Sequence, residues 1–251
     1  MANLYETDKL LEEYLLLHYG TPELVLPWAF GPKEALEFPA RCVTERVKPV
    51  ERARALEIGC SVGRACFELS VFCDDVIGID YSNSFIRQAQ ALQQTREATF
   101  SSADEGELRA QHHYRLEERF RPDMIQFEVG DATDLRTDLG RFDIVLACNL
   151  LCRVPDPQSV LRRFADLVKP GGQLVLTSPY TWMEQYTPKR MWLGGFEHNG
   201  KAIRSLDSLK RALQKSFSCD NVVDMPFLIR EHSRKFQWSV AQASCWTRLE
   251  N

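Results

Sequence analysis

Two short segments constrain the fold of this chain more than any other feature. Residues 56–63 read LEIGCSVG and residues 76–80 read VIGID, so that Asp80 follows Gly63 by seventeen positions. One apolar strand thus runs into a glycine turn, and a second apolar strand ends in a carboxylate. In a βαβ unit the glycines let the backbone approach a nucleoside, and the acid accepts hydrogen bonds from the ribose hydroxyls. The pattern predicts a nucleoside-binding βαβ unit.

The spacing of the glycines argues against a dinucleotide. Gly59 and Gly63 are separated by three residues, and the turn lacks the third glycine that lets a helix close onto a pyrophosphate. An adenosine ligand without a pyrophosphate fits this turn better, and S-adenosylmethionine is the obvious one. The alternative is a pair of glycines that serve only a tight turn.

Apolar and helical segments alternate from residue 53 onward, which predicts a doubly wound α/β fold. Its mostly parallel, seven-stranded, Rossmann-like sheet should have helices on both faces. Strands are expected at 53–58, 75–80, 125–129, 142–147 and 173–178, with a C-terminal antiparallel hairpin from 220–226 and 235–247. Helices are expected at 8–19, 33–47, 63–72, 84–94, 158–168 and 205–216, and Ser82 is expected to cap the fourth of these.

The remaining segments are expected to be additions to one core. Residues 1–52 are predicted to form an N-terminal helical segment that covers the active site, and residues 53–251 the ligand-binding core. Residues 95–122 are polar and charged and contain almost no β-branched side chains. They predict a polar insertion that is helical over 105–119.

Composition excludes several classes of protein. The 251 residues are 44% hydrophobic and 26% charged with a net charge of −4, and no basic tract marks a nucleic-acid partner. No apolar run is long enough for a bilayer, and the N-terminal segment lacks the bases of a signal peptide, so a cytoplasmic protein without a membrane partner is expected. The eight cysteines form no Cys-x-x-Cys pair, and neither a metal site nor a disulfide framework is expected.

The motifs from residue 53 to residue 178 resemble, in order, those of class I S-adenosylmethionine-dependent methyltransferases. The resemblance implies that Glu57, Gly59, Cys60 and Gly63 surround the methionine and ribose portions of the cofactor, and that Asp80 binds the ribose hydroxyls. Glu57 lies inside an apolar strand, where a carboxylate is costly unless it is paired. A hydrogen bond within the turn or to the ligand is one interpretation, and a salt bridge, for instance with Arg64, is the other.

The same resemblance assigns the adenine and methyl ends of the cofactor. Tyr81 would lie against the adenine ring, and Asp131 and Ala132 would contact its amino group and a ring nitrogen. Cys148 and Asn149, at the end of the fourth strand, would face the methionine amino group and the methyl. Asp131 could instead cap a helix over 133–139.

Four further segments make the resemblance specific to one group of these methyltransferases. Residues 5–8 (YETD), 18–20 (HYG), 177–182 (TSPYTW) and 234–238 (RKFQW) are similar to the ovothiol-biosynthesis methyltransferases. That family methylates an imidazole nitrogen of 4-mercaptohistidine (5-thiohistidine) to give ovothiol A and S-adenosylhomocysteine. The resemblance implies a small amino-acid acceptor. It also implies fusion to, or cooperation with, an iron-dependent sulfoxide synthase.

Aromatic side chains near the expected ligand edge of the sheet are candidates for the acceptor pocket. We predict that Tyr14, Phe30, Tyr180 and Trp182 wall a flat imidazole, and that Asn149 and Tyr180 form the catalytic pair that fixes its tautomer and rotation. Further aromatic candidates for the same wall are Tyr19, Trp28, Tyr186 and Trp192. Ordinary core packing is the alternative for the aromatic residues, and a loop cap is the alternative for Asn149.

Partners for the carboxylate and ammonium of the acceptor are not distinguished by the sequence. Arg153, Arg190, Arg230 and Arg234 are candidates for the carboxylate, and Glu197 and Glu231 for the amine. The other functions left open are methylation of another small metabolite and a non-catalytic nucleotide-binding regulatory domain.

Overall fold

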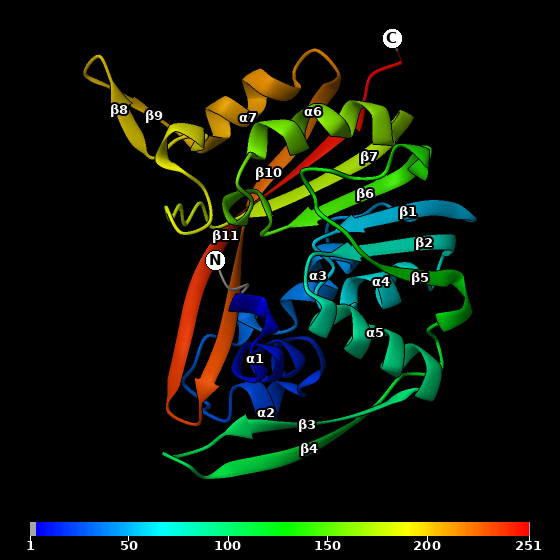
Figure 1. The fold of residues 1–251 in the computed structure, drawn as a ribbon, viewed down its shortest axis with the longest axis vertical. Coiled ribbons are helices and arrows are strands. Elements are labelled where there is room, and N and C mark those ends of the chain that lie inside the picture. The colour runs from blue at the N-terminus through cyan, green and yellow to red at the C-terminus, as the bar shows by residue number, and fades with distance from the viewer. Residues whose placement is uncertain (1–3, 251) are drawn as a thin grey trace.

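The computed structural model describes residues 4–250, and a seven-stranded sheet forms its centre (Figure 1). The strand order is β10-β11-β7-β6-β1-β2-β5. The parallel strands are β1 (Ala53–Ile58), β2 (Cys73–Asp80), β5 (Ile125–Val129), β6 (Phe142–Cys148) and β7 (Val168–Ser178). The strands β10 (Phe217–His232) and β11 (Lys235–Arg248) form an antiparallel hairpin that pairs with β7. The predicted fold class is confirmed.

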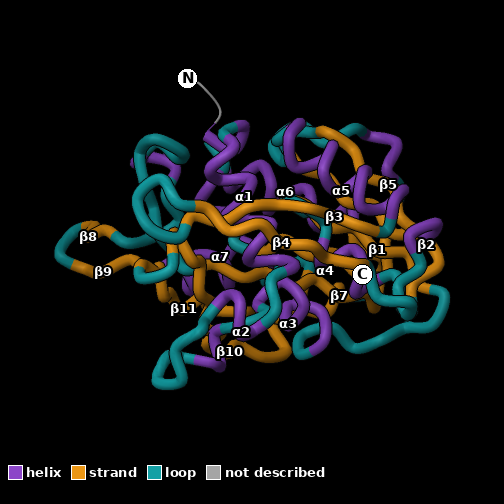
Figure 2. Tube along the Cα trace, turned by 90° about the horizontal axis from the view of Figure 1, so that it is seen from below, coloured by secondary structure: helices purple, strands orange, loops and turns teal. Residues whose placement is uncertain are grey.

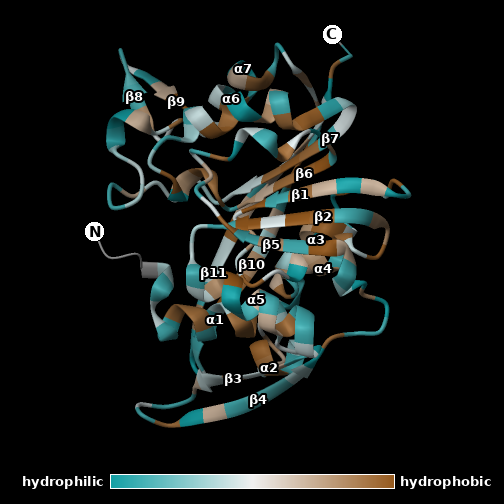
Figure 3. Ribbon diagram, turned by 45° about the vertical axis from the view of Figure 1, so that its right-hand side comes forward, coloured by the Kyte–Doolittle hydropathy of each residue, from teal (hydrophilic) through white to brown (hydrophobic). Residues whose placement is uncertain are grey.

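Helices cover both faces of the sheet because alternate residues of each strand point to opposite sides. Ala55 packs in one apolar cluster with Phe67 and Ile86, whereas its neighbour Leu56 packs in the other cluster with Phe164. The helices on the first face are α4 (Arg64–Leu69) and α5 (Asn83–Thr95), and those on the second are α6 (Pro157–Leu167) and α7 (Ser205–Leu213). Hydrophobic residues concentrate along the central strands (Figure 3). As predicted, the Ser82 side chain caps α5.

The N-terminal segment contains three helices, α1 (Asp8–Tyr19), α2 (Pro22–Val25) and α3 (Phe38–Thr44). The predicted helix over 33–47 is interrupted, because Glu37 adopts a left-handed conformation with φ of 55° immediately before α3. At the end of α1, the Tyr19 hydroxyl donates a hydrogen bond to the Val62 carbonyl at 2.6 Å. This bond ties the segment to the glycine turn that follows β1.

The insertion is a β-hairpin, and the helix expected over 105–119 is wrong. Strands β3 (Glu97–Ala103) and β4 (Arg109–Arg115) pair antiparallel, with Phe100 opposite His112. Ala98, Phe100 and Ser102 are buried while the residues between them are more exposed. This is the period of two that a strand requires. The polar composition of the hairpin, visible in Figure 3, hides that period in the sequence.

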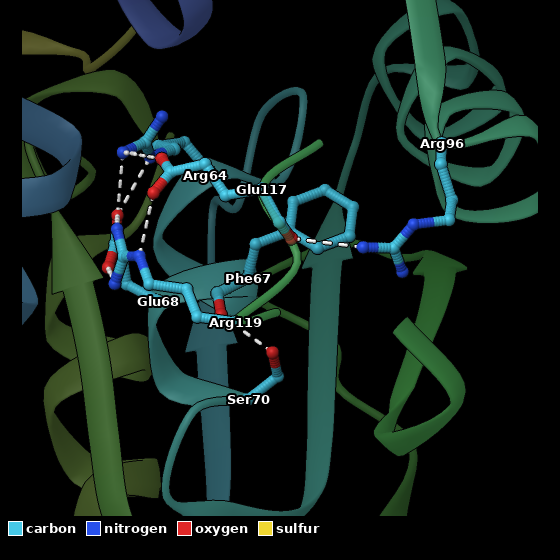
Figure 4. A network of polar contacts seen from close by, with 7 residues as sticks. All are labelled: Arg64, Phe67, Glu68, Ser70, Arg96, Glu117 and Arg119. Carbon is cyan, nitrogen blue, oxygen red and sulfur yellow. Dashed lines mark hydrogen bonds and ion pairs between the residues drawn. The ribbon is translucent and has the colours of Figure 1, made fainter. Parts of the chain in front are cut away.

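An ion cluster around the buried Glu68 holds the segment after this hairpin against α4 (Figure 4). The Glu68 side chain is only 1% exposed and accepts hydrogen bonds from Arg64 at 2.7 Å and from Arg119 at 2.7 and 2.9 Å. Glu117 pairs with Arg119 at 2.8 Å, and the Arg119 guanidinium lies 4.3 Å from the centre of the Phe120 ring. We call Arg64, Glu68, Glu117 and Arg119 the Glu68 ion cluster.

The remaining elements are short. Strands β8 (Phe196–His198) and β9 (Lys201–Ile203) form a hairpin that projects from one end of the molecule (Figures 1 and 2). The single 3-10 turns are η1 (Leu4–Glu6), η2 (Lys33–Ala35), η3 (Pro122–Met124), η4 (Thr137–Leu139), η5 (Leu151–Arg153) and η6 (Lys189–Met191). No helix within residues 4–250 is long and apolar enough to cross a membrane.

Candidate active site

A cavity of about 920 Å³ opens at the carboxyl ends of the central parallel strands. Its floor is formed by residues that end β1, β2 and β6 or follow β5, and the N-terminal helices and the β10–β11 hairpin supply other walls. Ligands of open α/β sheets bind at this edge. The volume lies toward the upper end of the usual range for small-molecule sites, which leaves room for more than one reactant.

The glycine turn after β1 has the backbone shape that the sequence predicts. Gly59 and Gly63 have φ values of 79° and 92°, in the region that favours glycine. The amides of Gly59 and Cys60 both donate to the Ile79 carbonyl, at 2.7 and 3.0 Å. A Cβ on Gly63 would lie 2.6 Å from the Phe127 ring. Gly59 lines the cavity, whereas Cys60 and Gly63 shape the turn beneath it.

Asp80 joins this turn to the start of α5. One carboxylate oxygen accepts from the Ser61 amide at 2.8 Å and the other from the Ser82 amide at 2.9 Å. Burial raises the pKa of Asp80, and these backbone hydrogen bonds oppose that rise. Each carboxylate oxygen can accept a further bond. Asp80 lines the cavity, and it can therefore hold two ligand hydroxyls while it fixes both loops.

Glu57 lines the same cavity from inside β1, and none of residues 4–250 forms an ion pair with it. The Cys66 thiol donates to its carboxylate at 3.0 Å, and burial raises the pKa of Glu57 to about 8. The suggested salt bridge with Arg64 is wrong, because Arg64 is committed to the Glu68 ion cluster. A cationic ligand group beside Glu57 would stabilise its carboxylate.

The side assigned to adenine is open and polar. Tyr81 is 63% exposed and lines the cavity together with Asp131 and Ala132. Asp131 Oδ1 accepts from both the amide and the hydroxyl of Thr133 at 2.7 Å. The suggested helix over 133–139 is wrong, since this segment contains only the short η4. Within residues 4–250, Asp131 Oδ2 has no hydrogen-bond partner, so it remains available to a ligand.

Two buried polar atoms of cavity-lining residues have no hydrogen-bond partner in the described chain: Ser61 Oγ in the turn and His18 Nδ1 on α1. Burial, aided by the charge of Arg64, lowers the pKa of His18 to about 3, so the ring is neutral. Buried polar atoms without partners are costly unless a ligand or water supplies the bond. Together with the glycine turn, they offer hydrogen bonds to the part of a ligand that lies over this turn.

Asn149 stands at the end of β6 with a φ of 52°. Its amide donates to the Thr177 carbonyl at 2.9 Å, and its Oδ1 accepts from the Thr177 hydroxyl at 3.0 Å. Within residues 4–250, its Nδ2 has no acceptor, and the residue lines the cavity. Cys148 lines it as well, and a hydrogen bond with Cys42 and burial raise the pKa of Cys148.

Three of the predicted acceptor residues lie outside the cavity lining. Phe30 is 88% exposed and lies beside the Trp28 ring. Tyr180, at φ 51°, donates its hydroxyl to Gln242 at 3.1 Å, and the indole nitrogen of Trp182 donates to Ser205 at 2.9 Å. The backbone turns after β7 so that Pro179 and Thr181, rather than Tyr180 and Trp182, face the cavity. Tyr14 is the one of the four predicted aromatic residues that lines it.

Sequence reasoning missed several lining residues, because nothing local marks them. Phe38 and Phe227 face the cavity from α3 and from β10. Tyr5 reaches it from η1. Tyr186, by contrast, belongs to the aromatic group predicted from the sequence, and it lines the cavity from the loop after β7. Their convergence depends on how distant segments pack. The single signal in the sequence was the segment at 5–8, which contains Tyr5. Within the described residues, no group of three or more His, Cys, Asp and Glu side chains could hold a metal ion.

A family model described as "Methyltransferase domain" matches residues 28–216. The chain is 29% identical over 123 residues to the ubiquinone biosynthesis O-methyltransferase of Coxiella burnetii, covering 49% of this chain and 42% of that protein. It is also 29% identical over 133 residues to the Escherichia coli protein of the same name, covering 52% of each. The match thus spans about half the length of these relatives.

Solved structures share the fold. The N-methyltransferase NodS from Bradyrhizobium japonicum, in complex with S-adenosylhomocysteine, superposes with a TM-score of 0.53 at 16% identity, covering 96% of this chain and 99% of NodS. A S-adenosylmethionine-dependent methyltransferase from Methanosarcina mazei gives a TM-score of 0.54 at 17% identity, covering 83% and 97% of the two chains.

Proposed function

The chain belongs to the methyltransferase domain family, and on that premise we propose that it methylates an imidazole ring nitrogen of 4-mercaptohistidine, giving ovothiol A. It is a methyltransferase that uses S-adenosylmethionine and has a Rossmann-like fold. The choice of 4-mercaptohistidine as the acceptor rests on the resemblance of the flanking segments to ovothiol-biosynthesis methyltransferases. An iron-dependent sulfoxide synthase, fused or separate, is its expected partner.

The observation that carries the proposal is one continuous cavity that joins the glycine turn and Asp80 to a second region beyond Asn149. Phe38, Cys42 and Phe227 line this second region, so an apolar wall faces a planar acceptor. The cofactor supplies an electrophilic methyl group on a sulfonium. The protein then has to hold the acceptor nitrogen in line with that methyl and exclude water, which is catalysis by positioning.

Different residues hold the cofactor and orient the acceptor in this proposal. The turn at Gly59 and the Asp80 carboxylate fix the nucleoside, and Ser61 Oγ and His18 Nδ1 offer bonds to its amino-acid end. Asn149 Nδ2 can donate to an acceptor atom other than the nucleophile, and so sets which atom faces the methyl. This matters because the acceptor thiolate is a better nucleophile than its ring nitrogen, and selectivity is a difference between two transition states.

Tyr180 does not contact the cavity, and its proposed role changes accordingly. Its hydroxyl holds Gln242 on β11, next to the strand β7 whose Thr177 fixes Asn149. Tyr180 is therefore a positioning residue in this proposal, and Asn149 is the residue expected to touch the acceptor.

The test is a reaction of the protein with S-adenosylmethionine and 4-mercaptohistidine, with products identified by mass spectrometry and NMR. We expect an N-methylated product and one equivalent of S-adenosylhomocysteine, with Asn149→Ala raising the share of S-methylated product. The same preparation should also bind S-adenosylhomocysteine, which shows that the protein is active. Binding without turnover of 4-mercaptohistidine would refute the proposed acceptor.

A second candidate is O-methylation, which the names of the relatives favour, and we take a phenol as the acceptor to be tested. A phenol has to lose its proton before or during methyl transfer, whereas a neutral imidazole already offers a lone pair. A catechol offered in the same assay separates the two. Methylation of the catechol and not of 4-mercaptohistidine would establish the O-methyltransferase alternative.

A further inference from the structure

One cation faces the cavity. Among the cavity-lining residues of the described chain, Arg153 is the single arginine or lysine. It ends η5, just after β6, and its Nη1 donates to the carbonyls of Cys152 at 3.1 Å and Thr181 at 2.8 Å. Within residues 4–250, no carboxylate lies within ion-pair distance of Arg153. Its charge is therefore available to an anionic ligand.

Three tyrosines surround this guanidinium. The Arg153 guanidinium carbon lies 4.9 Å from the centre of the Tyr186 ring. The Tyr5 ring lies 6.2 Å from Tyr186 and 6.1 Å from Tyr14, and side-chain hydrogen bonds link Tyr5 to both. All four residues line the cavity. We call them the Arg153 cluster.

The chemistry of the Arg153 cluster suits a carboxylate. Burial raises the pKa of Tyr14 to about 12 and raises the pKa of Tyr5 further, while the charge of Arg153 opposes both shifts. The hydroxyls of Tyr5 and Tyr14 therefore remain protonated. A guanidinium beside phenolic hydroxyls can offer charge-assisted hydrogen bonds to an anion.

The other arginines considered from the sequence are outside the cavity lining. Arg230 donates to the Leu24 carbonyl, and the Arg234 guanidinium lies 5.4 Å from the centre of the Trp28 ring. Arg190 is exposed on η6. Of these four arginines, Arg153 is therefore the one that lines the cavity and can contact a bound reactant.

The cofactor and the proposed acceptor each carry a carboxylate. The residues around the Arg153 cluster indicate which of the two carboxylates it binds. Arg153 lies four positions after Asn149, the residue proposed to touch the acceptor, and both line the cavity. The His18 ring stacks on Tyr14 with ring centres 6.1 Å apart, and the unpartnered atoms His18 Nδ1 and Ser61 Oγ are available to the amino-acid end of the cofactor. The Arg153 cluster is left for the acceptor.

We propose that Arg153 and the hydroxyls of Tyr5, Tyr14 and Tyr186 bind the carboxylate of the acceptor. The acceptor is then an imidazole amino acid and not the corresponding imidazole amine. This inference rests on the proposed function for the imidazole, and adds the carboxylate as the group that the enzyme requires.

The experiment compares wild type, Arg153→Gln and the control Arg190→Gln on 4-mercaptohistidine and on its decarboxylated amine. Loss of a charge-assisted pair is expected to lower kcat/KM for the amino acid by about 10- to 100-fold, mostly through KM, and for the amine by less than about threefold. The control should behave as wild type. Tyr186→Phe keeps the ring beneath the guanidinium and should give a smaller loss on the amino acid alone. Equal losses on both acceptors would overturn the inference.

Binding measurements separate this inference from the proposed function. Arg153→Gln should bind S-adenosylhomocysteine as wild type does, and tenfold weaker binding would instead assign Arg153 to the cofactor. If wild type methylates neither acceptor, the proposed function fails, and histidine and histamine can be titrated into the protein loaded with S-adenosylhomocysteine. Tighter binding of histidine that disappears in Arg153→Gln would sustain the inference, and equal binding of both in wild type would overturn it.

Discussion

The Glu68 ion cluster and the ligand cavity both contain buried polar groups, but they differ in whether those groups have partners. In the cluster, Glu68 is fully paired with Arg64 and Arg119 (Figure 4). In the cavity, Ser61 Oγ and His18 Nδ1 have no partner within residues 4–250, and Arg153 faces no carboxylate. Since a buried polar group normally finds a partner, satisfied groups indicate a structural role, and unsatisfied groups that line the cavity are available to a ligand.

The largest effect is expected in the Glu68 ion cluster. Glu68→Ala removes the partner that the buried Arg64 shares with Arg119, and should lower the free energy of unfolding by about 3 kcal/mol. Urea denaturation measures this change. Well below the melting temperature, the affinity for S-adenosylhomocysteine should stay within about threefold of wild type.

A matched change at the surface sharpens that comparison. Glu128 pairs with Arg136 at 2.9 Å in a partly exposed ion pair. Glu128→Ala should cost less than about 1 kcal/mol, because water screens such pairs. Equal losses in Glu68→Ala and Glu128→Ala would contradict the structural role given to the cluster.

The next effect concerns binding. Asp80→Ala removes the acceptor for two backbone amides and for the ribose hydroxyls, and should weaken S-adenosylhomocysteine binding about 100-fold or more. Isothermal titration calorimetry measures the affinity, and circular dichroism checks that the variant is folded. A folded variant with less than fivefold weaker binding would remove Asp80 from the site.

The smallest effect is a pH dependence of stability. Glu57 has a folded pKa of about 8 against an ordinary value of 4.5, so the folded state retains a proton that the unfolded state loses, and stability falls as pH rises across that window. His18 has a folded pKa of about 3 against 6.5, so its contribution rises with pH and is complete above about pH 6.5. Between pH 6.5 and 8, Glu57 dominates.

Over that interval the ligand-free protein should lose about 1.6 kcal/mol of stability. This is less than about 1.36 kcal/mol per pH unit, because the folded state begins to lose the same proton as the pH approaches 8. Urea denaturation at the two pH values measures the loss, which Glu57→Gln should abolish. Glu184→Gln, at an exposed position of the same cavity, should keep it. Retention of the full loss in Glu57→Gln would show that another group titrates.

The sequence predicted the elements whose signals are local. The glycine turn, Asp80 and the apolar strands around them identify the sheet because each depends on a few adjacent residues. The β3–β4 hairpin was missed because its polar side chains obscure the alternation of buried residues at Ala98 and Phe100.

The acceptor side was predicted less well for a different reason. The directions of Tyr180 and Trp182 depend on a backbone turn with a positive φ at Tyr180, which residue type does not reveal. The Arg153 cluster unites η1, α1, η5 and the loop after β7, segments up to 181 positions apart between Tyr5 and Tyr186. No local pattern predicts such a convergence.

The central claim is that the unpartnered atoms at the glycine turn mark the cofactor's binding site. A crystal structure of the protein with S-adenosylhomocysteine tests it most directly. We expect the ribose hydroxyls on the Asp80 carboxylate and the amino-acid end against Ser61 Oγ and His18 Nδ1. A nucleoside bound elsewhere, or one that leaves Asp80 without a ribose contact, would contradict the account.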